Sequence, residues 1–211
     1  MKGIFRLLAI LCLLTIISCS SNKNEQPKET TTPPPDTTHT TIETPYDQYT
    51  VVDVSPMDMT YFPADYPKLK MAKAITSPPL ARIVYSRPHL QNRKLFQEVL
   101  KYGEPWRLGA NESTELELFQ HATVQGKRVN AGRYILYCIP QQDNWTIVFN
   151  SNIDSWGLHQ DSTKDVMRFT IPALPTANHV EYFTMLFEGK GTEAELLMAW
   201  DGIEARLPFR F

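Results

Sequence analysis

The residues best suited to chemistry lie in one short stretch, residues 105–112, which reads Pro-Trp-Arg-Leu-Gly-Ala-Asn-Glu. Arg107 carries a permanent charge on a planar fork that matches a carboxylate, and Glu112 follows it across a Gly-Ala turn. One interpretation is structural: an Arg107–Glu112 ion pair locks the loop, with Trp106 packed beneath it. Asn111 would then satisfy backbone groups of the loop. Such loop-locking pairs are common and imply no chemistry.

A functional interpretation uses the same residues as the polar floor of a cleft. Trp106 and Trp156 would form its apolar or sugar-stacking walls. His89 and His159 are the histidines that could join Glu112 if their loops converge. The ligand-binding candidates are therefore Trp106, Arg107, Asn111, Glu112, Trp156, His159 and His89.

The residue pattern gives no support for a metal or a cofactor. The five histidines show none of the His-Glu-x-x-His, His-x-His or Cys-His spacings that hold zinc. The chain also has no Gly-x-Ser-x-Gly nucleophile turn and no phosphate-binding Gly-x-x-x-x-Gly-Lys loop. We therefore predict no metal, no cofactor and no established catalytic residue.

Carboxylates offer one route to catalysis. Glu112, Glu115 and Glu117 follow one another along a strand-like run, and a pair of carboxylates is what glycoside hydrolysis requires. In this hypothesis Glu112 is the acid or base and Arg107 is its electrostatic partner. An exposed polar strand face explains the same alternation more simply.

The elements that must position these residues are mostly strands. Short β-branched and aromatic runs recur about every ten residues from Leu80 to Phe209 and are separated by turn residues. This pattern predicts a mainly β fold, an antiparallel jelly-roll-like β-sandwich with at most one or two short helices. One helical turn or short helix is expected over residues 93–102. Asp201-Gly202 predicts a two-residue hairpin between two strands.

The N-terminus predicts export and lipidation. Lys2 and Arg6 precede a short apolar run that is too short to span a bilayer, and the run ends in Ile16-Ile17-Ser18-Cys19. This is the pattern of a lipoprotein signal peptide, residues 1–18, cleaved before a lipid-modified Cys19. Residues 19–48 are rich in Thr and Pro and predict a disordered tether. We expect residues 49–79 to be an extended segment that packs on a β-sandwich domain of residues 80–211.

The charge balance limits the partners. The chain has a net charge of −2, and its sequence contains no basic cluster. Nucleic acid is therefore not an expected partner. The expected partners are a membrane, through the lipid on Cys19, and an envelope protein or glycan. Cys138 would be the remaining cysteine of the lipidated chain, and its strand-like surroundings predict a buried thiol.

Several motifs in order resemble a known family. Pro105 to Glu112 is the most specific of them, and the others are Ser86-Arg87-Pro88, Ala131-Gly132-Arg133-Tyr134, Trp145-Thr146-Ile147 and Trp156-Gly157. Together, over residues 83–188, they resemble a family of Bacteroidota lipoproteins known as the domain of unknown function DUF2911. The family commonly has a Gly-Arg pair where this chain has Asn92-Arg93. The resemblance supports the fold and the compartment and implies no activity.

These patterns lead to one main functional hypothesis. The chain is a lipid-anchored protein of the bacterial envelope, and its domain is a non-catalytic binding or interaction module. The alternatives are a small hydrolase of envelope glycans or oligosaccharides that uses Glu112 with Arg107, and a structural subunit. Residues 20–22, Ser-Ser-Asn, lack the acidic cluster that resembles a surface-export signal, which favours an outer-membrane position facing the periplasm.

Overall fold

The computed structural model describes residues 54–211. The predicted signal peptide, Cys19, the tether and residues 49–53 lie outside this range. The strands are β1 (Met57–Phe62), β2 (Ala81–Ser86), β3 (Thr114–Leu118), β4 (Ala122–Val124), β5 (Lys127–Val129), β6 (Gly132–Pro140), β7 (Asn144–Asn150), β8 (Asp165–Lys190) and β9 (Glu193–Arg210). The helical elements are α1 (Tyr66–Met71), the π-helical turn η1 (Leu95–Val99) and the 3-10 turn η2 (Ser162–Lys164).

The strands form one sheet in the order β1-β2-β3-β6-β7-β8-β9-β4-β5, and all of the pairings between these strands are antiparallel. The prediction of a mainly β, antiparallel fold with few short helices is confirmed. Because the strands are continuous in a single sheet, the division into two sheets of a sandwich stays a prediction. The helical turn expected over residues 93–102 forms as η1.

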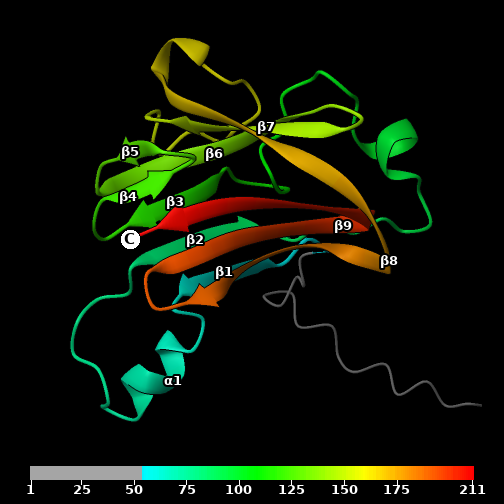
Figure 1. The fold of residues 1–211 in the computed structure, drawn as a ribbon. Helices are drawn as coiled ribbons and strands as arrows, with labels where there is room; N and C mark the ends of the chain where they lie inside the picture. Colours follow the sequence, from blue (N-terminus) through cyan, green and yellow to red (C-terminus); the bar gives the residue numbers. More distant parts are fainter. Residues whose placement is uncertain (1–53) are drawn as a thin grey trace, which may run out of the picture. The chain divides into compact units, whose positions relative to one another are not determined.

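The two long strands β8 and β9 let this sheet curl around its own core (Figure 1). The first part of β8 pairs with β7 and its second part pairs with β9. Aromatic side chains from distant strands consequently meet. Phe62 of β1 lies 6.0 Å from Phe187 of β8, and Phe149 of β7 lies 6.3 Å from Phe209 of β9, measured between ring centroids. These rings belong to one buried hydrophobic cluster.

The predicted hairpin at Asp201-Gly202 is wrong. Both residues lie inside β9, and the chain on either side of them pairs with β8 instead of with itself. Asp201 adopts a φ of 56°, and the register with β8 shifts beside it, so the dipeptide forms an irregularity within a strand pair. The hairpin turn lies between Lys190 and Glu193, where Gly191 has a φ of 66°.

The segment expected to be extended over residues 49–79 contains two regular elements in its described part. Strand β1 pairs along its whole length with β2, and its last residue, Phe62, is buried in the core. Helix α1 follows and carries no buried residue. In residues 54–211 no helix combines the length and the apolar character that crossing a membrane requires.

Candidate functional site

The 105–112 loop is fastened to β6. Trp106 and Cys138 exchange two backbone hydrogen bonds of 2.7 Å each, and the Gly103 N–H donates to the carbonyl of Pro140 at 2.8 Å. This isolated bridge continues the ladder that β3 makes with β6, which ends where Thr114 pairs with Leu136. The loop therefore starts from a fixed point on the sheet.

Trp106 is a core anchor. It is 9% exposed, and its ring centroid lies 4.8 Å from Phe183, 5.5 Å from Trp200 and 6.1 Å from Trp145. Its indole N–H donates to the carbonyl of Gly109 at 3.1 Å. The structural interpretation placed Trp106 beneath the loop, and the structure places it there. An open sugar-stacking wall would need a larger exposed ring than Trp106 offers.

The turn after Arg107 has a strained backbone. Leu108 adopts a φ of 54°, which is uncommon for residues other than glycine, and Asn111 adopts a φ of 57°, which asparagine tolerates better than most residues. The Thr114 hydroxyl donates to the carbonyl of Leu108 at 2.7 Å, and the Asn111 amide donates to the carbonyl of Ser55 at 3.4 Å. A Cβ on Gly109 would lie 3.1 Å from the carbonyl oxygen of Ser86. These contacts hold the turn in one conformation.

Arg107 does not form the ion pair expected with Glu112. Its Nη1 donates to the carbonyl oxygens of Asn111 and Trp156, the latter at 3.3 Å. Among residues 54–211 it contacts no carboxylate, and its Nε and Nη2 have no hydrogen-bond partner there. Partial burial lowers the pKa of Arg107. Arg133, in contrast, has a raised pKa because it binds the Glu115 carboxylate.

Gly157 explains how the following loop reaches Arg107. It adopts a φ of 79°, and a Cβ there would lie 2.5 Å from Ser113 Oγ and 3.2 Å from Arg107 Cβ. Only glycine permits this approach without a shift of the neighbours. The Trp156 carbonyl is thereby brought to Arg107, while its indole side chain stays exposed at 58%.

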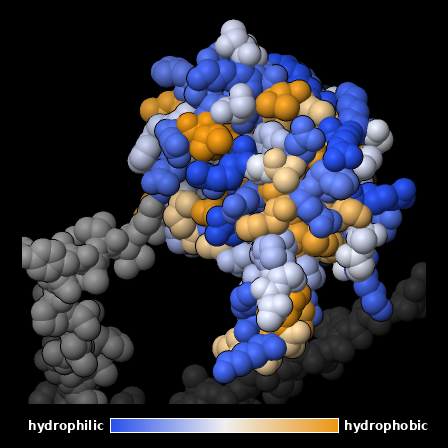
Figure 2. All heavy atoms as spheres, turned by 90° about the vertical axis from the view of Figure 1, so that its left-hand side faces the viewer, coloured by the Kyte–Doolittle hydropathy of each residue, from blue (hydrophilic) through white to orange (hydrophobic). Residues whose placement is uncertain are grey.

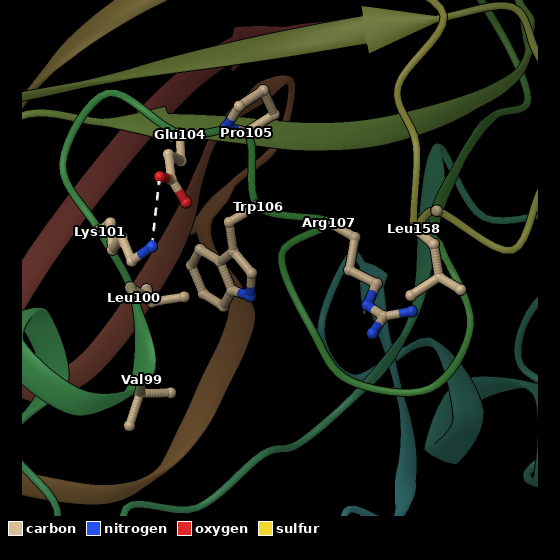
Figure 3. Close-up of a pocket in the computed structure, with 9 residues that line it drawn as sticks. Val99, Leu100, Lys101, Glu104, Pro105, Trp106, Arg107 and Leu158 are labelled. Carbon is tan, nitrogen blue, oxygen red and sulfur yellow. Dashed lines mark ion pairs between the residues drawn. The ribbon is translucent and has the colours of Figure 1, made fainter.

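Two hollows lie at this loop. The first, which we call the arginine hollow, has a volume of about 250 Å³ and is lined by Val99, Leu100, Lys101, Glu104, Pro105, Trp106, Arg107, Gly157 and Leu158. Figure 3 shows Trp106 and Arg107 projecting from consecutive positions, with Leu158 beside the guanidinium. Lys101 and Glu104 form an ion pair with a distance of 3.5 Å between Nζ and Oε1.

The second, the glutamate hollow, has a volume of about 350 Å³ and is lined by Glu112, Ser113, Glu115, Arg133, Ile135, Asp154, Ser155 and Trp156. Its charges are largely paired. Arg133 binds both oxygens of Glu115, with an Nε–Oε1 distance of 3.0 Å, and its Nη2 lies 3.7 Å from Asp154 Oδ1. Glu112 is exposed and has no ion-pair partner among residues 54–211.

The two candidate histidines do not join Glu112. The His89 ring stacks on Tyr182 with a centroid distance of 5.0 Å, and its Nδ1 lies 3.9 Å from Glu181 Oε1. His159 is exposed on the loop after Gly157. Within the described part of the chain no three His, Cys, Asp or Glu side chains could hold a metal ion together.

Sequence reasoning missed Lys101, Glu104 and Leu158, which line the arginine hollow. Lys101 and Glu104 stand three residues apart, a spacing that permits an ion pair at a turn, and they lie directly before the 105–112 loop. Leu158 follows the Trp-Gly pair. The sequence gives no sign that Leu158 lines a hollow, because its position depends on the backbone conformation of Gly157 before it.

The fold and the site define a class: a mainly β domain with a loop-lined hollow around an arginine that has no acidic partner among residues 54–211. The chain belongs to the family described as protein of unknown function (DUF2911), whose model matches residues 68–209. This match is wider at both ends than the resemblance over residues 83–188. At the Asn92-Arg93 pair, Asn92 adopts a left-handed φ of 62°, a conformation that glycine also favours. Searches found no match among curated proteins and none among solved structures.

Proposed function

We propose that this chain is a lipid-anchored binding protein of the bacterial envelope, and that its domain captures a ligand without chemically changing it. One observation carries the binding function: Arg107 is a rigidly placed cation in a hollow, with no acidic side chain to neutralise it among residues 54–211. Buried or half-buried charges are normally paired. A charge that the fold leaves unpaired, beside an open space, is suited to a ligand.

The anchor in this proposal rests on the N-terminal sequence. A positive start, a short apolar run and Cys19 after Ile-Ile-Ser match a lipoprotein signal peptide. The Thr/Pro-rich residues 19–48 would give the domain reach from the membrane. An outer-membrane position facing the periplasm fits these residues, and an envelope glycan or protein would then supply the ligand.

The surroundings of Glu112 support the proposal that the domain binds its ligand without catalysing a reaction. Glycoside hydrolysis by Glu112 would need a second free carboxylate at a separation of about 5–9.5 Å. Glu115 shares the glutamate hollow with Glu112 and is bound at both oxygens by Arg133. The hydrolase hypothesis keeps one favourable observation, which is that Glu112 does line an open hollow.

One face of the domain also favours a compact ligand over a broad protein interface. On the face shown in Figure 2, hydrophobic side chains lie in separate small groups among hydrophilic ones. Large protein interfaces usually have a more continuous apolar centre. Two exposed apolar side chains lie at the hollows. Leu158, which is 65% exposed, lines the arginine hollow, and Trp156, which is 58% exposed, lines the glutamate hollow.

Saturation-transfer NMR of the mature lipoprotein in neutral detergent, with a panel of soluble muropeptides and envelope oligosaccharides, tests the proposal. We expect at least one compound to bind and to be recovered unchanged. Leu158→Ala should weaken that binding because Leu158 lines the arginine hollow, whereas Leu174→Ala should not, because Leu174 is similarly exposed, at 54%, and lines neither hollow.

Two results would overturn the proposal. The first is that no member of the panel binds. The second is cleavage of a panel member by the wild-type protein that stops in Glu112→Gln, which would establish the hydrolase instead.

A further inference from the structure

The chemistry of the ligand can be inferred from the arginine hollow. We propose that this hollow receives the anionic end of a ligand, a carboxylate or a phosphate group, and that Arg107 binds it through two parallel hydrogen bonds. This inference rests on the proposed binding function and narrows it to one ligand chemistry.

The charge of the lining supports an anion. Of the residues that the structure describes, the ionisable ones that line the hollow are Lys101, Glu104 and Arg107. Because Lys101 and Glu104 form an ion pair at 3.5 Å, no acidic side chain within the described residues 54–211 compensates the charge of Arg107. The glutamate hollow provides the contrast, since its arginine, Arg133, is already bound by Glu115 and approached by Asp154.

The guanidinium of Arg107 also has the donors that an anion needs. Its Nη1 is occupied by the carbonyls of Asn111 and Trp156, which fix the direction of the side chain. Its Nε and Nη2 have no hydrogen-bond partner in residues 54–211. A guanidinium edge with two N–H groups matches two oxygens of a carboxylate or phosphate. The side chain is thus already ordered, which lowers the entropic cost of binding.

The volume and the lining of the hollow indicate the size and polarity of the group that carries the anion. A volume of about 250 Å³ is slightly below the roughly 300–1,000 Å³ of sites that enclose a drug-sized molecule. The hollow therefore fits a terminal group. Leu158, Leu100 and Pro105 supply apolar wall, so an anion carried on a ring or a short apolar segment fits better than a fully hydrated ion.

Isothermal titration calorimetry with small probes tests this inference. The mature lipoprotein in neutral detergent is titrated with benzoate, with phenyl phosphate and with the neutral analogue benzyl alcohol. We expect benzoate or phenyl phosphate to bind and benzyl alcohol to bind at least about tenfold more weakly, since a charged hydrogen-bonding partner is lost. The stronger of the two anions identifies whether the natural group is a carboxylate or a phosphate.

A designed competitor avoids mutating Arg107, whose substitution could disturb the loop. Leu158→Glu places a carboxylate beside the guanidinium at a position that is 65% exposed. Leu158→Gln has nearly the same shape and no charge. We expect Leu158→Glu to weaken anion binding about tenfold or more and Leu158→Gln to change it severalfold at most.

The outcomes separate this inference from the proposed function. Equal binding of benzyl alcohol and the anions, or equal affinities in Leu158→Glu and Leu158→Gln, would overturn the anion inference. If neutral oligosaccharides bind in the NMR panel while neither anion binds, the anion inference is wrong and the binding function stands. If nothing binds in either experiment, both are wrong.

Discussion

At the level of single residues, the loop around Arg107 is energetically unfavourable in two ways, through its backbone conformation and through the lost hydration of a charge. Other contacts of the fold must offset both. Leu108 and Asn111 lie in the left-handed region, and Arg107 loses hydration without gaining an ion pair in the described range. For Leu108 this conformation costs roughly 1–2 kcal/mol, and for Asn111 it costs less. Strain of this kind is concentrated at ligand-binding sites in many proteins. The buried Trp106 and its bridge to Cys138 provide the compensating contacts.

Gly157 should be intolerant of a side chain. In Gly157→Ala the positive φ and the 2.5 Å approach to Ser113 Oγ act together, so we expect a loss of about 2–4 kcal/mol in the free energy of unfolding. Gly126→Ala is the matched control, because Gly126 has a similar φ of 76° and open space around its Cβ position. It should lose only about 1–2 kcal/mol. Equal losses in urea unfolding would contradict the close packing.

Cys138 should be unreactive in the native protein. The thiol is fully buried, and burial raises its pKa well above the ordinary value. Because the thiolate is the reactive form, alkylation at pH 8 should be slow and should accelerate with urea as the domain unfolds. Rapid stoichiometric reaction of Cys138 in native buffer would show that β6 is more open than the structure indicates.

At the scale of elements, Tyr85 links β2 to β8. Its hydroxyl donates to the carbonyl of Met185 at 3.1 Å and accepts from the N–H of the same residue at 2.8 Å. The two residues are far apart in the sequence, and their contact keeps the second part of β8 against β2. Leu90 and Pro88 add backbone hydrogen bonds to the same strand.

Tyr85→Phe should destabilise the domain by about 1–3 kcal/mol at pH 7, because the Met185 N–H would be left buried without a partner. Burial raises the pKa of Tyr85 to about 12, whereas an unfolded tyrosine titrates near 10. The phenol therefore stabilises the folded state fully below pH ~10, and this contribution is lost as the pH rises towards 12.

Urea unfolding between pH 8 and 11.5 measures this effect. The wild-type protein should lose more stability over this range than Tyr85→Phe does. Tyr137, whose pKa is also raised to about 12, contributes equally to both proteins, so the difference isolates Tyr85. Parallel curves for the two proteins would show that Tyr85 does not titrate as the structure implies.

Local patterns predicted the elements better than the site. The alternation of buried and partly buried residues in β2 and β3 is visible in the sequence, which is why a mainly β fold could be predicted. The site depends on contacts between distant residues. The Trp106–Cys138 bridge and the approach of Gly157 direct Arg107 towards two carbonyls and away from Glu112. The prediction of a hairpin at Asp201-Gly202 failed because it also depends on distant residues. Pairing of β9 with β8 overrides the local hairpin preference.

At the level of the whole molecule, we propose that a lipid anchor holds a folded domain in which Arg107 receives the ligand. Cys19→Ala should move the protein from the membrane fraction to the soluble fraction and abolish labelling with radioactive palmitate. Cys12→Ala, inside the apolar run, is the matched control and should leave anchoring unchanged. Membrane retention of Cys19→Ala at the wild-type level would contradict the proposed anchor.

NMR of the arginine Nε–H groups can show whether Arg107 is the group that binds the ligand. The resonance of Arg107 is assigned by its loss in Arg107→Lys. We predict that benzoate or phenyl phosphate shifts this resonance in the wild-type protein and that benzyl alcohol does not. If an anion binds while the Arg107 resonance stays unchanged, the ligand lies elsewhere and the proposed role of Arg107 is wrong.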